Sequence, residues 1–152
     1  MVRQLIKASI MGLGLVAAAC GGGGEGGGEG GGGEDVDVTL QEFAIGTDPS
    51  SVSAGSVTFN IENKGPDDAH EFVVIRTDLD PTALPTEKNG SVSETGEGME
   101  VVDEVEEIPV GDTPTLTVDL TAGSYVLICN IYDKAEKESH YQEGMRTAFT
   151  VA

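Results

Sequence analysis

Short runs in which apolar and polar residues alternate recur along the chain from residue 35 onward. Val36, Val38 and Leu40 alternate with polar residues in the first run, and the same period of two returns over residues 57–62 and 115–120. This alternation turns one face of a strand toward a core and the other toward water. Further strands are expected where apolar and β-branched residues gather, over residues 70–76, 99–106, 123–130 and 146–151.

Turn-forming residues separate these runs, at residues 54–55, 64–66, 111–112 and 122–123. No long stretch carries the 3.6-residue apolar period of an amphipathic helix. Many short strands joined by regular turns predict an all-β domain built as a two-sheet sandwich. Residues 77–98 interrupt the rhythm with Gly, Pro and Asp, so we expect a long loop there.

The N-terminus follows a different pattern. Arg3 and Lys7 accompany a mostly apolar stretch, residues 5–16, which leads to three alanines and then Cys20. This arrangement resembles the lipobox of bacterial lipoproteins, in which cleavage precedes a cysteine that receives a lipid, although Ala17 stands where Leu is more common. An ordinary secretory signal and a short anchor helix are the alternatives. The apolar run is short for a membrane span, which needs about 20 residues.

A glycine tract follows Cys20. Residues 21–33 are all glycine except Glu25 and Glu29, so they offer no apolar surface to bury and favour a flexible spacer with a reach of roughly 20 Å. We therefore expect a signal peptide over 1–19, a lipidated Cys20 with a linker over 20–34, and one domain over 35–152. The protein would be extracytoplasmic, with its membrane contact through the lipid on Cys20.

The charge of the chain restricts the classes of partner that it can bind. The sequence has 27 Asp and Glu against 8 Lys and Arg, a formal net charge of −19. Such a surface repels nucleic acid phosphates, which argues against nucleic acid binding. It suits a cationic protein partner, and it also promotes solubility without any partner.

Cys129 is unpaired if Cys20 carries a lipid, and an unpaired thiol in an exported protein needs an explanation. It could be a buried inert cysteine at the end of an apolar strand, a nucleophile paired with a histidine, or a metal ligand. The ligand hypothesis accounts for more residues. The only two histidines are His70 and His140, and Met145 follows His140 after a glycine that permits a close turn.

Two imidazoles and a thiolate with a weak thioether form the ligand set of a blue copper site. The sequence therefore predicts one copper ion bound by His70, Cys129, His140 and Met145. Zinc could occupy the same ligands.

The chain from about residue 35 onward also resembles the cupredoxins, the plastocyanin and azurin family of single-domain blue copper proteins. The matching elements are Asn63-x-Gly65 followed by His70, Gly123-x-Tyr125 followed by Cys129, and His140 with Met145 before a final strand. The resemblance implies a Greek-key β-sandwich in which those four residues bind one type 1 copper.

Two positions depart from the family pattern. Ten residues separate Cys129 from His140, where the family usually has only a few, and most of the extra segment, residues 132–139, is charged. We expect this segment to bulge into solvent beside the site. The residue after His70 is Glu71, where the family often has an asparagine that ties the ligand loops together.

These features predict an electron carrier rather than an enzyme. The carrier would be monomeric and lipid-anchored, and it would exchange single electrons with redox partner proteins at the membrane surface. The first alternative is a copper-binding lipoprotein for scavenging or delivery of the metal, which would use the same ligands. The second is an interaction module of the same shape without a metal.

Overall fold

The computed structural model describes residues 33–152. The expected signal peptide, the lipidated Cys20 and the linker up to residue 32 lie outside the described residues. Among the residues that are described, no helix is long and apolar enough to cross a membrane.

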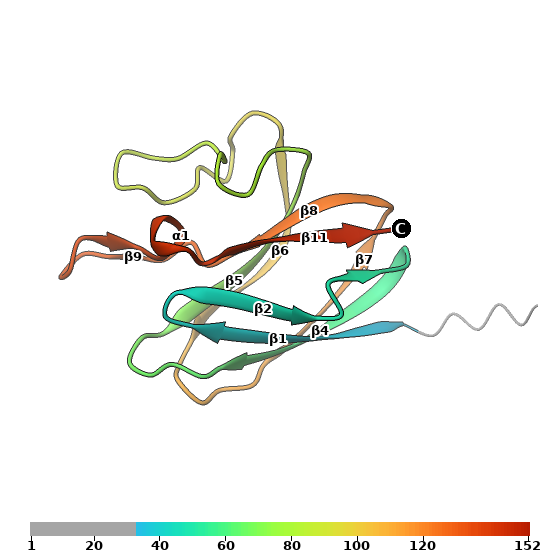
Figure 1. Cartoon of the computed structure of the whole chain (residues 1–152), viewed down its shortest axis with the longest axis horizontal. Helices are drawn as coiled ribbons and strands as arrows, with labels where there is room; N and C mark the ends of the chain where they lie inside the picture. The colour runs from blue at the N-terminus through green and yellow to red at the C-terminus, as the bar shows by residue number, and fades with distance from the viewer. Residues whose placement is uncertain (1–32) are drawn as a thin grey trace, which may run out of the picture.

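Two β-sheets face each other (Figure 1). The four-stranded sheet has the order β2-β1-β4-β7, with β1 Glu34–Gln41, β2 Ala44–Asp48, β4 Gly55–Asn63 and β7 Thr115–Leu120. The five-stranded sheet has the order β3-β11-β8-β5-β6, with β3 Ser51–Val52, β5 His70–Thr77, β6 Met99–Ile108, β8 Gly123–Ile128 and β11 Arg146–Val151. The chain changes sheets after β2, β3, β4, β6 and β7, so it forms the expected all-β sandwich.

All seven strands predicted from the sequence are present, and the first begins one residue earlier than expected, at Glu34. The sequence did not indicate β2, β3, the small hairpin of β9 Tyr132–Asp133 and β10 Glu138–Ser139, or the one-turn helix α1 His140–Glu143. These elements are too short to carry a detectable apolar period. Of these elements, β3 pairs with a strand distant in sequence, its parallel neighbour β11, whereas β2 and the β9–β10 pair form local hairpins.

The main core lies between the two sheets. The apolar residues that alternate along β1 and β4 are all buried there, with Val36, Leu40 and Phe59 at 0% exposure. A second, smaller apolar cluster lies on the outer face of the five-stranded sheet and consists of Val73, Ile75, Leu84, Val92, Val126, Ile128 and Tyr141. Strand β5 is therefore covered on both faces, which explains why its sequence is nearly continuous in apolar residues.

Residues 78–98 form the expected long loop, and it covers this second cluster. The Asn130 side chain holds the loop, since its Oδ1 accepts from Val92 N at 2.6 Å and its Nδ2 donates to Val92 O at 3.1 Å. The Tyr141 hydroxyl donates to Pro81 O at 2.8 Å and accepts from Leu84 N at 3.1 Å. These bonds satisfy backbone groups that the loop would otherwise leave unpaired.

Candidate metal centre

Four elements bring the predicted ligands to one end of the sandwich. His70 is the first residue of β5, and Cys129 comes directly after β8. Because β5 and β8 are antiparallel neighbours, with Val73 opposite Ile128, the start of one strand lies beside the end of the other. His140 opens α1, and Met145 connects that helix to β11. The site thus forms at the ends of two central, fully paired strands.

Three donor atoms converge in the interior. Nδ1 of His70 lies 3.2 Å from Nδ1 of His140, and the Cys129 sulfur lies 3.4 Å from Nδ1 of His140 and 3.9 Å from Nδ1 of His70. The exposures of the three residues are 0%, 2% and 0% for His70, His140 and Cys129. These side chains come from sequence positions up to 70 residues apart, so only the fold brings them together.

Met145 is buried at 0% exposure beside these residues. Its backbone carbonyl accepts from Cys129 N at 3.1 Å, and its own N–H donates to His140 O at 2.9 Å. The preceding Gly144 has a φ of 132°, and a Cβ there would lie 3.0 Å from the Phe43 carbonyl oxygen. The close turn that the sequence predicted at this glycine is therefore present, and it places Met145 beside Cys129 and His140.

The long segment between Cys129 and His140 folds into the β9–β10 hairpin, which projects from the sandwich (Figure 1). Its tip, residues 134–137, is exposed as expected. At its base, His140 N donates to the Ile131 carbonyl at 3.0 Å, and Tyr132 pairs with Ser139. This closure places His140 next to Ile131. The extra residues therefore project away from the site, and His140 stays beside Cys129.

Backbone groups also support the sulfur and the first histidine. The Cys129 sulfur accepts from Glu71 N at 3.2 Å. Asn63 is fully buried and holds the loop before His70, because its Nδ2 donates to Asp68 O at 2.9 Å and to Ile108 O at 2.8 Å while its Oδ1 accepts from Gly65 N at 2.8 Å. The Glu71 N–H thus ties the His70 strand to the Cys129 sulfur, and Asn63 ties the loop before His70 to the end of β6.

Two residues of the β1–β2 turn also contact the site, and the sequence analysis did not indicate them. Glu42 Oε1 lies 3.6 Å from Nε2 of His70. The Phe43 ring packs edge-on against the His140 ring, with centroids 5.2 Å apart. No local pattern distinguishes a glutamate and a phenylalanine in a short turn, so only the packing of the turn against β5 and α1 reveals their position.

Burial keeps the site uncharged in the absence of a metal. It raises the pKa of the Cys129 thiol to about 12, although the N–H groups of Glu71 and Ile131 act in the opposite direction. Burial also lowers the pKa of His70, as does the neighbouring His140, and burial lowers the pKa of His140. At neutral pH the site therefore presents two neutral imidazoles and a thiol, and a metal ion must displace the thiol proton.

The donor chemistry restricts which ions fit. Imidazole nitrogens and a thiolate, with a thioether adjacent, favour copper or zinc and disfavour the oxygen-binding ions Mg²⁺ and Ca²⁺. The carboxylate oxygens of a second group, Glu71, Glu104 and Glu106, also lie within 4.8 Å of one another, but Glu71 and Glu104 are only partly buried and Glu106 is exposed.

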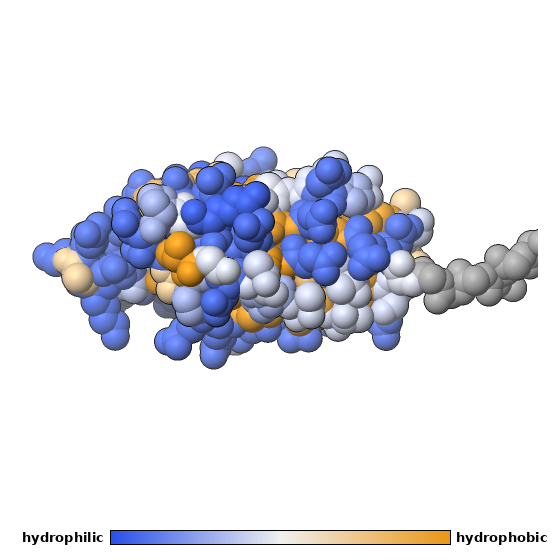
Figure 2. Space-filling view, turned by 90° about the horizontal axis from the view of Figure 1, so that it is seen from below, coloured by the Kyte–Doolittle hydropathy of each residue, from blue (hydrophilic) through white to orange (hydrophobic). Residues whose placement is uncertain are grey.

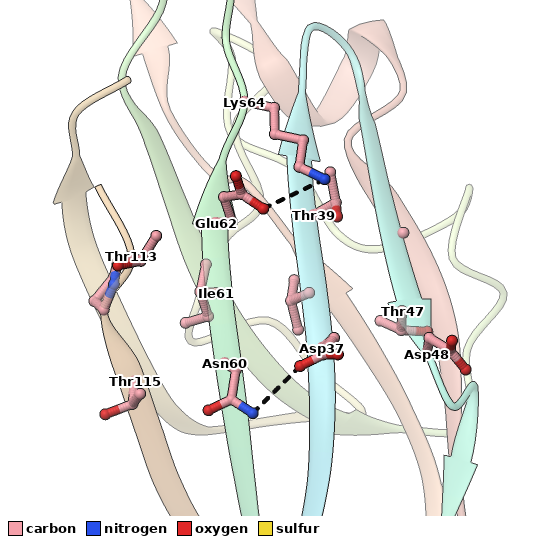
Figure 3. A pocket seen from close by; sticks show the side chains of 13 residues that line it. Asp37, Thr39, Thr47, Asp48, Asn60, Ile61, Glu62, Lys64, Thr113 and Thr115 are labelled. Atoms are coloured by element: carbon pink, nitrogen blue, oxygen red, sulfur yellow. Dashed lines mark hydrogen bonds and ion pairs between the residues drawn. The ribbon is translucent and has the colours of Figure 1, made fainter. Parts of the chain in front are cut away.

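A hollow of about 770 Å³ lies on the outer face of the four-stranded sheet (Figure 3). Its side chains pair with one another, as Lys64 does with Glu62 at 3.3 Å and Asn60 with Asp37 at 3.3 Å. A smaller hollow of about 360 Å³ is lined by His140 together with Asp68, Ala69, Glu107, Pro109, Ile131 and Asp133. At this smaller hollow, the predicted ligand His140 adjoins the protein surface.

A scan with protein-family models found no match to this chain. A search of curated proteins found no match either. Solved structures do match. A dithionite-reduced auracyanin from the photosynthetic bacterium Roseiflexus castenholzii superposes with a TM-score of 0.53 at 20% identity, covering 80% of this chain and 99% of that one. The fold is that of the cupredoxins.

Two further cupredoxins give similar values. Auracyanin A of Chloroflexus aurantiacus, described as a "blue" copper protein, has a TM-score of 0.54 at 18% identity over 80% of this chain and 100% of its own. Rusticyanin of Thiobacillus ferrooxidans has a TM-score of 0.52 at 18% identity over 80% and 79%. The cupredoxin fold is thus retained although few residues are shared.

Proposed function

We propose that this protein is a type 1 copper electron carrier that holds one copper ion with His70, Cys129, His140 and Met145. The observation that carries the proposal is the convergence of two Nδ1 atoms and one sulfur within a buried space. The similarity in fold to auracyanin A, a blue copper protein, supports the same conclusion.

The residues of the chain would make electron exchange fast. When bound, copper supplies a one-electron couple between Cu(I) and Cu(II). Both sheets contribute to the core that surrounds the donors, so their positions change little and the reorganisation that accompanies electron transfer stays small. The low exposure of His70, Cys129 and His140 keeps water from the donors. These properties suit a carrier rather than an enzyme.

We infer that electrons pass through the edge of His140. This residue lines the hollow of about 360 Å³, whereas His70 lies deeper. Three carboxylates, those of Asp68, Glu107 and Asp133, surround the same hollow and would attract a basic redox partner. The surface seen in Figure 2 is also largely hydrophilic, with hydrophobic residues in small patches between hydrophilic ones.

We further propose that the carrier is an extracytoplasmic monomer tethered to the bacterial membrane through a lipid on Cys20, with 1–19 as signal, 20–34 as linker and 35–152 as domain. The support for the membrane tether is the lipobox-like sequence that ends at Cys20. The described chain begins at the end of the sandwich opposite α1 (Figure 1). A tether there would leave the metal end facing away from the membrane and toward partners. Incorporation of labelled fatty acid into the intact chain, and its loss in Cys20→Ser, would test the anchor.

Copper loading tests the main proposal. The loaded domain is expected to absorb strongly in the visible range, to give the paramagnetic resonance signal of a type 1 site, and to bleach reversibly with ascorbate. A pale protein that releases copper readily to a chelator would instead indicate copper delivery. Failure to take up copper at all would leave an interaction module.

A further inference from the structure

Two buried polar atoms beside the candidate metal centre have no hydrogen-bond partner within residues 33–152. Among the described residues, neither Nε2 of His70 nor Oε2 of Glu42 has a hydrogen-bond partner. The other carboxylate oxygen, Oε1, lies 3.6 Å from Nε2 of His70. The two side chains are 0% and 12% exposed, so water does not readily satisfy them. Buried groups of this kind are rare and call for a partner.

The carboxylate of Glu42 is held in place from the other side. Its Oε1 accepts from Asp68 N at 2.7 Å and from Asp67 N at 3.2 Å. These two residues belong to the loop that leads into His70. Glu42 therefore links the β1–β2 turn to that loop and stays beside the imidazole, while the adjacent Phe43 packs against His140.

The geometry of His70 decides where its proton must lie. Nδ1 faces the Cys129 sulfur and His140, so a metal ion in the site would bind at Nδ1. A neutral imidazole that gives Nδ1 to a metal carries its proton on Nε2. That N–H would then be a buried donor, and the Glu42 carboxylate lies beside it, with Oε1 3.6 Å from Nε2.

We propose that Glu42 accepts a hydrogen bond from Nε2–H of His70 in the copper-loaded protein and thereby lowers the reduction potential of the site. The inference rests on the proposed copper site. A carboxylate in this position fixes the tautomer and orientation of the ring and makes the imidazole a stronger donor. A stronger donor with a negative charge nearby favours Cu(II) over Cu(I). Glu42 is in this sense a positioning residue and not a ligand.

A purely structural role makes a different prediction. If Glu42 only holds the backbone of residues 67 and 68, then glutamine should replace it, because the amide oxygen can accept the same two bonds. Glu42→Gln keeps the size and this acceptor but removes the charge. Glu100→Gln is the matched control, since Glu100 is exposed and lies on β6 opposite Arg76, at the far end of the strand from His70.

The experiment measures the reduction potential of the copper-loaded full chain and of both variants by spectroscopic titration. For Glu42→Gln we expect the affinity for Cu(II) relative to Cu(I) to fall about tenfold, a rise in potential of about 59 mV for one electron, with a visible band still present. Glu100→Gln should leave the potential unchanged. Equal potentials for the two variants would overturn the role of Glu42 while leaving the copper site intact.

A second measurement needs no variant and remains decisive if Glu42→Gln fails to fold. In the diamagnetic Cu(I) protein, proton NMR should show a slowly exchanging, downfield-shifted Nε2–H of His70 coupled to its ring nitrogen. An Nε2–H that exchanges rapidly with water would overturn the proposal. A wild-type chain that takes up no copper would overturn both this proposal and the proposed function.

Discussion

Strand β5 contributes one residue to each of two groups of ligating side chains, which lie on opposite faces of its sheet. His70 points into the interior and meets Cys129 and His140, whereas Glu71 points outward and meets Glu104 and Glu106. In both groups the donor atoms lie within 4.8 Å of one another. The first group is buried and the second is partly or fully exposed. Proximity alone therefore does not separate a metal centre from a cluster of acidic surface residues.

The difference lies in the cost of burial. The imidazoles and the thiol are neutral without a metal, so the protein can bury them and hold them close together. The carboxylates repel one another, and partial burial together with Glu104 and Glu94 raises the pKa of Glu71 to about 7. A group that is stable without an ion can be preorganised for a soft metal. The outer group lacks that property.

Substitution of the sulfur ligand should have the largest effect. Cys129→Ser removes the thiolate, so the strong visible absorption should disappear. The affinity for Cu(II) should fall by more than about 100-fold, which exceeds the loss expected for a residue that only hydrogen-bonds to a ligand. Glu104→Gln is the control in the outer group and should leave the spectrum unchanged. The assignment would be wrong if the two variants exchanged these outcomes.

Proton release should be the next clearest difference. The pKa of Cys129 is about 12 and those of His70 and His140 are lowered, so near pH 8 both imidazoles are neutral and the thiol proton is the one that a metal ion must displace. Cu(II) binding should then release about one proton, and the apparent affinity should rise about tenfold per pH unit. Calorimetry in buffers of different ionisation enthalpy measures this number. A value near zero would contradict a thiolate ligand.

Tyr141→Phe should destabilise the packing of the 78–98 loop on the outer face of the five-stranded sheet without affecting the metal site. The variant loses the hydroxyl that bonds Pro81 O and Leu84 N and holds the 78–98 loop. We expect a loss of about 1 kcal/mol in the free energy of unfolding, which lowers Tm by a few degrees. The visible spectrum should not change, although Tyr141 adjoins His140. A spectral shift would show that the two faces are coupled.

The smallest effect is expected for Glu71→Gln. The raised pKa of Glu71 means that its ionised form destabilises the folded state. This cost is absent below the unfolded pKa, near 4.5, and fully present above the folded pKa, near 7. The variant should therefore be slightly more stable than wild type at pH 8 and equal to it well below pH 4.5, at about pH 3. Urea unfolding of the metal-free chain at the two pH values provides the check.

The sequence by itself determined most of the sheet framework. Val36, Val38 and Leu40 could be assigned to one buried face because the period of two is a local property of a strand. The four candidate ligands could be selected because histidine and cysteine are scarce in this chain and a type 1 copper site uses both.

Only the tertiary structure decided the rest. The β9–β10 hairpin closes at Ile131 and returns His140 to Cys129, and this depends on pairing that no local period encodes. Glu42 reaches His70 across 28 residues of sequence, through the packing of one short turn against a loop from another strand. Local patterns report which face of a strand is apolar. They do not report which distant side chains share a buried space, because that depends on how the sheets pack.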